Sequence, residues 1–366
     1  MNKLTLFSTL LFKNTPVYVH YGITHRCNLR CRMCGVWKTG DRETELSVDQ
    51  IDRMSEILHK LGTQVISIGG GEPLVREDLP EAVGAFIKRG ISVRILSNGV
   101  IEDYSRLQKV IDAGAVNFSI SLDTLDPDLQ NDIIGRQDAF NRVMDTLLYL
   151  APILKEKNGL GLINTVVSSA NLDCLPDLVD FAEKIGFYVS FVPLEVHQFS
   201  GKLLGCTETM QDLTFTQKDR EKAEQAFNEL VALKAQGKPV FNSSSFLKCA
   251  GKYMSGKEYK WDCRAGTLYF SISPEGYFSV CHHFSGYTMQ GSELSILDPD
   301  FLKIFKSKEY KNNAKKIQSE CLSCLRPCWA EISYLFNDYS ALIEMMNIQF
   351  GKSYPKKIPT RKEILH

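Results

Sequence analysis

The feature that most constrains the fold is a regular alternation of short apolar runs and longer amphipathic stretches between residues 17 and 191. The apolar runs are rich in β-branched residues, as strands are, whereas the stretches between them repeat their apolar positions at helical spacing. Strands separated by helices in this way form right-handed crossovers and a parallel sheet. The pattern therefore predicts an α/β protein with six parallel strands, at 17–24, 64–73, 92–99, 116–123, 159–168 and 188–195.

Polar residues and glycines follow these predicted strands, at the points where the chain leaves the sheet. In parallel α/β sheets the ligand site forms at the carboxyl ends of the strands. We therefore expect one site to which all six strand ends contribute, through Cys27, Gly70, Gly71, Glu72, Ser97, Asn98, Ser121, Asp123, Asn164, Val192 and Pro193.

The chain is expected to divide into four parts. Residues 1–16 resemble a signal peptide, but their apolar run is short, has no small-residue cleavage site and leads directly into the first strand, so we interpret them as a segment that packs on the body. Residues 17–200 form the α/β unit, and residues 201–260 form a linker with a polar amphipathic helix. Residues 261–366 form a second unit, with a hairpin around Glu275, a cysteine cluster and one final apolar helix.

Composition narrows the choice of partner and compartment. The 43 basic and 43 acidic residues balance, whereas a surface for nucleic acid or anionic membrane usually needs a basic excess. The segments outside residues 1–16 contain no apolar run long enough to span a membrane. The 11 cysteines lie in tight groups, which is the wrong pattern for a secreted disulfide scaffold. These features predict metal ligation in the reducing cytoplasm, without nucleic acid or a membrane span.

Three cysteines directly after the first strand have the spacing CxxxCxxC, as Cys27, Cys31 and Cys34. Thiolates are the soft ligands that iron-sulfur clusters require, and three on one loop can converge on one cluster. Three ligands to four irons leave one iron open for a substrate or cofactor, which separates a catalytic cluster from a simple electron carrier. Spacing alone also permits a zinc knuckle or a chance group. The position after a first strand, with GGEP in the next strand and helix unit, favours the cluster.

The motifs CNLRCRMC and GGEP resemble those of the radical S-adenosylmethionine (SAM) superfamily, and the resemblance extends from residue 17 to about residue 195. It implies a partial (β/α)6 barrel like a TIM barrel, with SAM bound to the open iron of a 4Fe-4S cluster. It also implies that Met33 lies by the adenine and that Gly70, Gly71 and Glu72 meet the methionyl amino group. Glycines permit close approach, and a carboxylate or carbonyl accepts from an ammonium.

By the same resemblance, residues at the other strand ends bind the rest of SAM. Ser97, Asn98, Ser121 and Asp123 are expected to bind the methionyl carboxylate and ribose hydroxyls. Asn164 and Val192 match the polar and adenine-side positions of the last two strands. Serine or asparagine after a strand also serves as a turn or cap residue, so this alternative stays open.

A second group of cysteines is arranged as Cys, then Gly-x4-Cys, then CxxC. This order is similar to the twitch and SPASM extensions of radical SAM enzymes, which hold auxiliary 4Fe-4S clusters. Two clusters with four thiolates each would need more than the five cysteines of this region, so we expect one auxiliary cluster of the twitch type. Its expected ligands are Cys263, Cys281, Cys321 and Cys324, with Cys328 as a spare or alternative ligand, while a structural zinc site is the other interpretation.

The resemblance implies a radical SAM oxidoreductase. SAM is cleaved reductively to a 5′-deoxyadenosyl radical, which abstracts a hydrogen atom from the substrate, and the auxiliary cluster assists a net oxidation or anchors the substrate. An electron donor such as flavodoxin or ferredoxin is implied. Glu195 and His197 are candidate catalytic residues by position only.

The substrate is expected to be a small molecule, because the 16 residues before the first strand leave no room for the peptide-recognition domain that many maturases carry. A ribosomal peptide is the alternative substrate. A non-catalytic iron-sulfur electron carrier is the alternative of a different class, and the intact CxxxCxxC and GGEP motifs argue against it.

Overall fold

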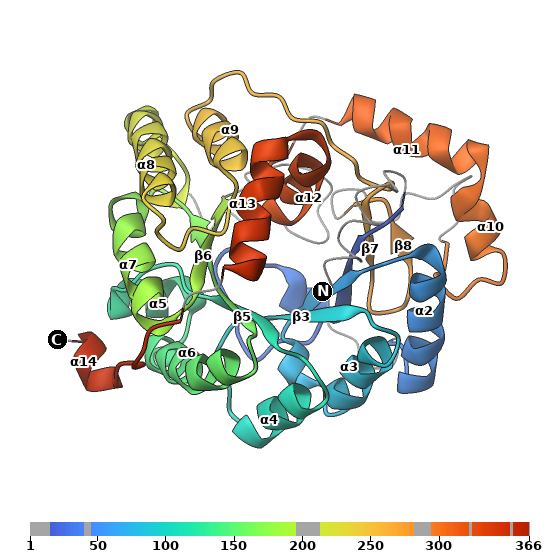
Figure 1. Cartoon of the computed structure of the whole chain (residues 1–366), viewed down its shortest axis with the longest axis horizontal. Coiled ribbons are helices and arrows are strands. Elements are labelled where there is room, and N and C mark those ends of the chain that lie inside the picture. Colours follow the sequence, from blue (N-terminus) through green and yellow to red (C-terminus); the bar gives the residue numbers. More distant parts are fainter. Residues whose placement is uncertain are drawn as a thin grey trace.

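The computed structural model describes residues 15–39, 45–194, 213–281, 294–321, 324–351 and 354–365. Within these ranges the strands form an eight-stranded sheet in the order β6-β5-β4-β3-β2-β1-β7-β8 (Figure 1). Neighbouring strands pair in parallel except β7 and β8, which form an antiparallel hairpin. The sheet curves without closing, so the predicted α/β fold with a partial barrel is confirmed. Its strands are β1 (Tyr18–Thr24), β2 (Val65–Gly70), β3 (Ser92–Ser97), β4 (Asn117–Ser121), β5 (Leu160–Val167), β6 (Tyr188–Pro193), β7 (Tyr269–Ile272) and β8 (Phe278–Ser279).

Helices between successive strands cover the outer face of the barrel (Figure 1). Helix α2 shows how the sequence sets their limits. Ser47 and Gln50 form a capping box at its start, and Gly62 ends it with a φ of 87°, a conformation that favours glycine. The outer helices are α2 (Val48–Leu61), α3 (Leu79–Ile87), α4 (Tyr104–Asp112), α5 (Pro127–Ile134), α6 (Ala139–Glu156) and α7 (Leu175–Ile185).

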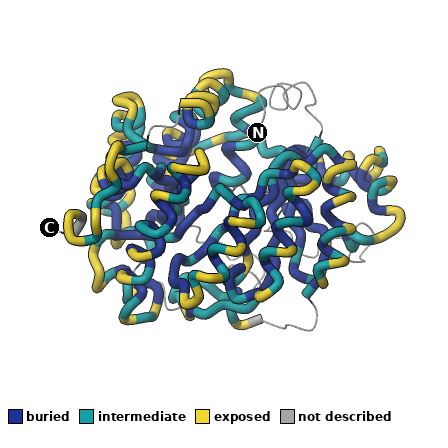
Figure 2. The backbone as a smooth tube through the Cα atoms, turned by 60° about the horizontal axis from the view of Figure 1, so that its bottom comes forward, coloured by how far each residue is buried: buried dark blue, intermediate teal, exposed yellow. Residues whose placement is uncertain are grey.

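The strands alternate between an apolar outer face and a more polar inner face. In β3, Val93 and Ile95 are buried, whereas Arg94 and Leu96, which alternate with them, are only partly buried. Successive side chains of a strand point to opposite faces, so the buried set packs beneath the helices and forms the main core (Figure 2). The inner face is left to line cavities.

The segment that we expected to be a linker, residues 201–260, contains a packed helix pair. Helices α8 (Gln217–Ala235) and α9 (Ser244–Met254) lie against each other next to β6 and α7. The side chain of Asn242 accepts a hydrogen bond from the backbone N–H of Phe191 in β6 at 2.7 Å, and Val189 forms a β-bridge with Val240. Residues 213–260 therefore belong to the body of the protein. The sequence pattern also did not predict α9.

The C-terminal region differs from the single apolar helix that the sequence predicts. Two helices, α12 (Pro327–Asn337) and α13 (Tyr339–Phe350), occupy this stretch. The chain is extended at Asp338, with φ −134° and ψ 109°, and the Asp338 carboxylate accepts from the backbone N–H groups of Ser340 and Ala341. Asp338 is thus an N-cap in the middle of the apolar sequence pattern, and it starts a new helix. The remaining helices are α10 (Phe301–Lys306), α11 (Lys308–Glu320) and α14 (Arg361–Leu365).

The predicted hairpin of the second unit is present as β7 and β8, and it extends the sheet of the barrel. Strand β7 pairs in parallel with β1, with Tyr18 opposite Tyr269. Trp329 of α12 is fully buried and stacks on Tyr269 with ring centroids 4.7 Å apart. The second unit is therefore fixed to the first by both a strand ladder and an aromatic stack. Among the described helices none is long and apolar enough to cross a membrane.

Candidate cofactor site

The three cysteines after β1 line one cavity of about 410 Å³ at the carboxyl ends of the strands. The backbone N–H of Leu29 donates to Cys27 Sγ at 3.4 Å, and the backbone N–H of Cys34 donates to the carbonyl of Cys31 at 3.2 Å. Burial, followed by the proximity of Cys34 and Cys27, raises the pKa of Cys31 to about 12. Thiols packed this closely lose their protons only to a strongly positive partner, which is how metal ligation and deprotonation are coupled.

The loop fits an iron-sulfur cluster better than a single ion. Among the described residues, no three His, Cys, Asp or Glu side chains are placed to hold one metal ion. The three thiols nevertheless face the same cavity, and a four-iron cluster takes its thiolates at separate corners. The residues present therefore suit the larger group.

Gly70 and Gly71 are required where β2 passes beneath the cysteine loop. A Cβ atom on Gly70 would lie 2.3 Å from the carbonyl oxygen of Thr24, and one on Gly71 would lie 2.1 Å from that of Arg26. The backbone N–H groups of Gly71 and Glu72 donate to these same two carbonyls at 2.7 and 2.9 Å. The glycines thus hold the cysteine loop against β2, and both also line the cavity.

Glu72 has a different placement from the one expected. It is buried, it does not line the cavity, and its carboxylate joins the ends of β2 and β3. One oxygen accepts from the backbone N–H of Leu74 (3.1 Å) and the hydroxyl of Ser97 (3.0 Å), and the other from the backbone N–H of Asn98 (2.8 Å). The carboxylate thus holds Ser97 and Asn98 at the cavity, and the expected contact of Glu72 with a methionyl amino group stays a prediction.

The remaining polar residues expected at the strand ends are brought together. Met33, Ser97, Asn98, Ser121, Asp123 and Asn164 all line the same cavity as the cysteines. Asp123 is buried and accepts from the backbone N–H of Val166 at 2.8 Å, and burial raises its pKa to about 7. The Asn98 amide donates to the side-chain oxygen of Asn28 at 2.9 Å, which ties β3 to the cysteine loop.

Three other candidates fall elsewhere. Val192 lines a second cavity deeper in the barrel, together with the lower part of β5. Glu195 and His197 lie outside the described residues.

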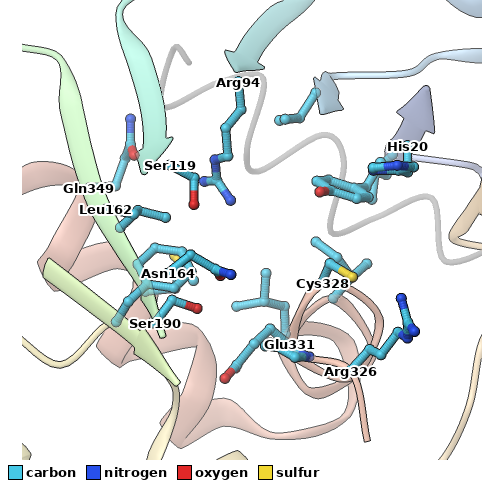
Figure 3. Close-up of a pocket in the computed structure, with 18 of the residues that line it drawn as sticks. His20, Arg94, Ser119, Leu162, Asn164, Ser190, Arg326, Cys328, Glu331 and Gln349 are labelled. Carbon is cyan, nitrogen blue, oxygen red and sulfur yellow. The ribbon is translucent and has the colours of Figure 1, made fainter. Parts of the chain in front are cut away.

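The second cysteine group lines a separate cavity of about 820 Å³. Cys263, Cys281, Cys321 and Cys324 face it. Cys328 does not, because it lies in the first turn of α12 and points into the deeper barrel cavity (Figure 3). The alternative role for Cys328 as a cluster ligand is therefore not supported by its placement.

Two aromatic residues at this second cavity were not singled out from the sequence. The Tyr269 hydroxyl lies 3.2 Å from Cys263 Sγ, and the Trp261 indole donates to the carbonyl of Cys324 at 2.7 Å. The only sequence signal for them was their nearness to Cys263.

The hairpin of the second unit also reaches the first cavity. Ser273 and Pro274, in its turn, line that cavity, and Glu275 pairs with His25 at 3.3 Å. The turn is held further by a hydrogen bond from the backbone N–H of Leu46 to the carbonyl of Pro274 at 2.8 Å. The sequence predicted the hairpin but gave no sign that it covers the cysteine loop.

A three-cysteine loop at the open end of an unclosed parallel barrel defines a class of cluster-binding α/β proteins. Residues 21–182 match the family model of the radical SAM superfamily. This part of the chain is therefore a radical SAM domain, and members of that superfamily use a 4Fe-4S cluster and SAM.

The comparisons with individual proteins give two kinds of relative. A GTP 3′,8-cyclase of Chlorobaculum tepidum is 31% identical over 232 residues, which cover 61% of this chain and 65% of the relative. A probable GTP 3′,8-cyclase of Methanococcus maripaludis is 32% identical over 47% of this chain and 58% of the relative. The chain thus spans about three fifths of the length of these relatives. A PqqA peptide cyclase of Rhodopseudomonas palustris is 24% identical over 84% of this chain and 79% of the relative.

Solved structures support the fold over most of the chain. Streptococcus suis SuiB bound to S-adenosylmethionine matches with a TM-score of 0.62 and 19% identity, covering 90% of this chain and 76% of that chain. The likeness extends beyond the barrel and includes the region of the second cysteine group.

Proposed function

We propose that this chain is an oxidoreductase that cleaves SAM reductively, abstracts a hydrogen atom from a small metabolite, and completes a net oxidation with the help of an auxiliary 4Fe-4S cluster. The observation that carries the proposal is the convergence of the cysteine loop and the polar ends of β3, β4 and β5 on one cavity of about 410 Å³.

In this proposal Cys27, Cys31 and Cys34 hold the first cluster. When bound and reduced, this cluster supplies the electron that cleaves SAM to the 5′-deoxyadenosyl radical. The protein contributes binding, orientation and the exclusion of water. The hairpin turn at Ser273 and Pro274 lies over the cavity, where it limits the entry of solvent and of stray hydrogen donors.

The strand ends would orient SAM. Carbonyl groups at Gly70 and Gly71 are suited to accept from the methionyl ammonium, whereas Glu72 acts by holding Ser97 and Asn98 in place. Asp123 and Ser121 are suited to the ribose hydroxyls, and Met33 to the adenine. Of the residues expected to meet the adenine side, Val192 instead belongs to the deeper cavity.

The second cysteine group would hold the auxiliary cluster through Cys263, Cys281, Cys321 and Cys324. Four thiolates complete its coordination, which favours electron transfer over anchoring of the substrate. A two-electron oxidation then balances as one hydrogen atom lost to the radical, one electron lost to the cluster, and one proton lost to a base. Glu195 and His197 remain candidates for that base, and flavodoxin or ferredoxin for the external electron donor.

A peptide substrate is the second candidate. A relative that matches 84% of this chain is named a PqqA peptide cyclase, whereas two relatives of 31% and 32% identity are named GTP 3′,8-cyclases. The barrel cavities of about 350 and 410 Å³ suit a small molecule or one side chain of a peptide. We therefore keep the small molecule as the first candidate.

The test is anaerobic. The clusters are reconstituted, reduced with dithionite and mixed with SAM, and 5′-deoxyadenosine is quantified in wild type, Cys31→Ala and Cys174→Ala. Cys174 is a matched control, because its thiol donates to the carbonyl of Asn171 at 3.3 Å, away from both cysteine groups. Wild type and Cys174→Ala should form 5′-deoxyadenosine and Cys31→Ala should not. Cluster-loaded wild type that forms none would overturn the proposal in favour of an electron carrier.

A further inference from the structure

The inner face of the barrel carries a polar residue on each of five strands. His20 of β1, Arg94 of β3, Ser119 of β4, Asn164 of β5 and Ser190 of β6 line the same deep cavity, which measures about 350 Å³ (Figure 3). The interior of a closed TIM barrel is instead filled with bulky branched side chains. This interior is therefore built as a chamber with a polar wall.

Arg94 is a charged residue of that wall. Within the described residues, no carboxylate forms an ion pair with it. Its Nε is buried and has no hydrogen-bond partner there. Its guanidinium carbon lies 5.4 Å from the centre of the Phe241 ring, and in Figure 3 the side chain points from β3 into the cavity beside Ser119. Burial lowers its pKa, and the acidic groups that oppose this shift are Tyr18 and Cys328.

The neighbouring acidic groups do not replace a counter-ion. Burial raises the pKa of Tyr18 to about 12, so the phenol is neutral at physiological pH. The Glu331 carboxyl accepts from the backbone N–H of Ser243 at 2.9 Å, and it is not among the groups that influence the pKa of Arg94. Buried charges are usually paired or bound, so an unbalanced guanidinium in a cavity indicates a ligand.

The opposite wall of the chamber is mostly apolar. It is formed by α12 and α13, through Ile332, Leu335, Phe336, Leu342 and Met345, alongside the polar residues Glu331 and Gln349. A ligand that fits both walls has an apolar body and one anionic head. Arg326 also lines the chamber, so the chamber favours an anionic group, and the planar guanidinium fork of Arg94 matches a carboxylate.

The chamber adjoins the cavity at the cysteine loop. The two cavities share His20, Leu96, Asn164 and Arg326 as lining residues. Arg94 lies three residues before Ser97 along β3, which places it roughly 10 Å below the strand ends at the usual rise per residue. A molecule held at Arg94 thus extends toward the site where the radical is proposed to form.

We propose that Arg94 binds the carboxylate of the substrate in this chamber and that α12 and α13 contact the apolar part of the same molecule. This inference rests on the proposed function for its meaning, since it names the chemical class of the substrate. The carboxylate can belong to a free small acid or to a peptide, and both present the same group to Arg94.

The test is binding by calorimetry to the cluster-loaded, SAM-bound protein under anaerobic conditions. The probes are octanoate, its neutral counterpart octanamide, the cation octylammonium, and a short apolar peptide with either a free or an amidated C-terminus. Wild type should bind octanoate at least about tenfold more tightly than octanamide, and octylammonium more weakly still, since a charge-assisted pair is worth about that factor. Preference for octanoate assigns a free acid, and preference for the free C-terminus assigns a peptide.

Substitutions show whether the preference for an acid depends on Arg94 itself or on the overall charge of the protein. Arg94→Gln should abolish the preference for octanoate while changing octanamide affinity less than about twofold. Arg94→Lys should keep part of the preference. Arg89→Gln is the matched control, because Arg89, in the turn after α3, pairs with Asp52 of α2 at 2.7 Å, and it should behave as wild type.

Equal affinities of each acid and its amide in wild type, or a preference that survives Arg94→Gln, would overturn the inference. If Arg94→Gln fails to fold, the comparison of acid, amide and ammonium in wild type decides alone. The same preparation is assayed for 5′-deoxyadenosine. Formation of 5′-deoxyadenosine without carboxylate preference rejects the subsite and keeps the proposed function. Carboxylate preference without formation of 5′-deoxyadenosine rejects the proposed function alone.

Discussion

The carbonyl oxygen of Arg26 lies so close to Gly71 that a Cβ atom on Gly71 would be 2.1 Å from it. Gly71→Ala should therefore push the cysteine loop away from β2 and destabilise the protein by about 2 kcal/mol or more. The loop carries Cys27, so the reconstituted iron content should fall as well. Urea unfolding and iron analysis on the same preparation measure both effects.

Gly84→Ala is the control for this change. Gly84 lies within α3, and a Cβ atom added there would meet nothing within 4 Å, so alanine should stabilise the helix by about 0.5–1 kcal/mol. If Gly71→Ala were as stable as Gly84→Ala, the close contact with Arg26 would not constrain the loop.

Removal of the Glu72 carboxylate should weaken SAM binding without releasing the cluster. In Glu72→Gln one carboxylate oxygen is replaced by an amide NH2 group, which cannot accept. Either the Asn98 N–H or the Leu74 and Ser97 donors then lose their acceptor, and a buried group left unpaired costs about 1–3 kcal/mol. Because Glu72 positions Ser97 and Asn98, the Kd for SAM should rise by about tenfold or more. Equilibrium dialysis with SAM, with iron content as the reference, checks this; Glu56→Gln on the exposed side of α2 should leave both unchanged. An unaltered SAM affinity would mean that the β2–β3 link does not shape the site.

Cys328 and Cys321 should respond differently to serine substitution. Cys321→Ser removes a thiol from the second cavity and should lower the reconstituted iron from about eight to about four per chain. Cys328→Ser alters the deeper barrel cavity and should keep the full iron content. Loss of iron in Cys328→Ser would instead place this cysteine among the cluster ligands.

Burial of Glu331 should make the free energy of unfolding depend on pH. Burial is the largest influence on it and raises its pKa to about 7, against the opposing effects of Ser243, Lys234 and Asn242. Between about pH 4.5 and pH 7 the folded chain keeps this proton while the unfolded chain has lost it, so the free energy of unfolding falls as pH rises through this window. Above pH 7 the contribution is constant. The total is about 3 kcal/mol.

Glu331→Gln should remove this component, because the amide oxygen can still accept from the Ser243 N–H and no proton is exchanged. The difference in unfolding free energy between Glu331→Gln and wild type should grow in favour of the variant from pH 5 to pH 8, as measured by denaturant titration at each pH. Glu309→Gln, at an exposed position of α11, should run parallel to wild type. Parallel curves for Glu331→Gln as well would show that this carboxyl titrates normally.

The barrel and the cysteine loop were predictable because their signals are local. Strand and helix periods repeat along the chain, and a parallel sheet brings the carboxyl ends of its strands together whatever the details of packing. Asn98, Ser121 and Asp123 were therefore expected near the cysteines from their places after strands, and they line one cavity with them.

The differences between expectation and structure lie where contacts between distant parts of the chain determine the local structure. The segment expected to be a linker packs on β6 through Asn242, and the last apolar pattern is cut at Asp338 by a cap. Glu72 follows a strand like the other candidates, but its carboxylate is consumed by donors from the next strand. Cys328 lies near the CxxC motif in sequence, yet the first turn of α12 directs it into the barrel.

The sequence by itself determined the radical SAM domain, the placing of the three cysteines of the CxxxCxxC loop together and the α/β class, because residue spacing and hydrophobic period are properties of neighbouring residues. Tertiary structure alone decided that β7 continues the barrel sheet beside β1, that the hairpin turn covers the cysteine loop, and that Arg94 faces a chamber closed by α12 and α13. These arrangements depend on which surfaces far apart in the chain bury each other, and no local pattern encodes that choice.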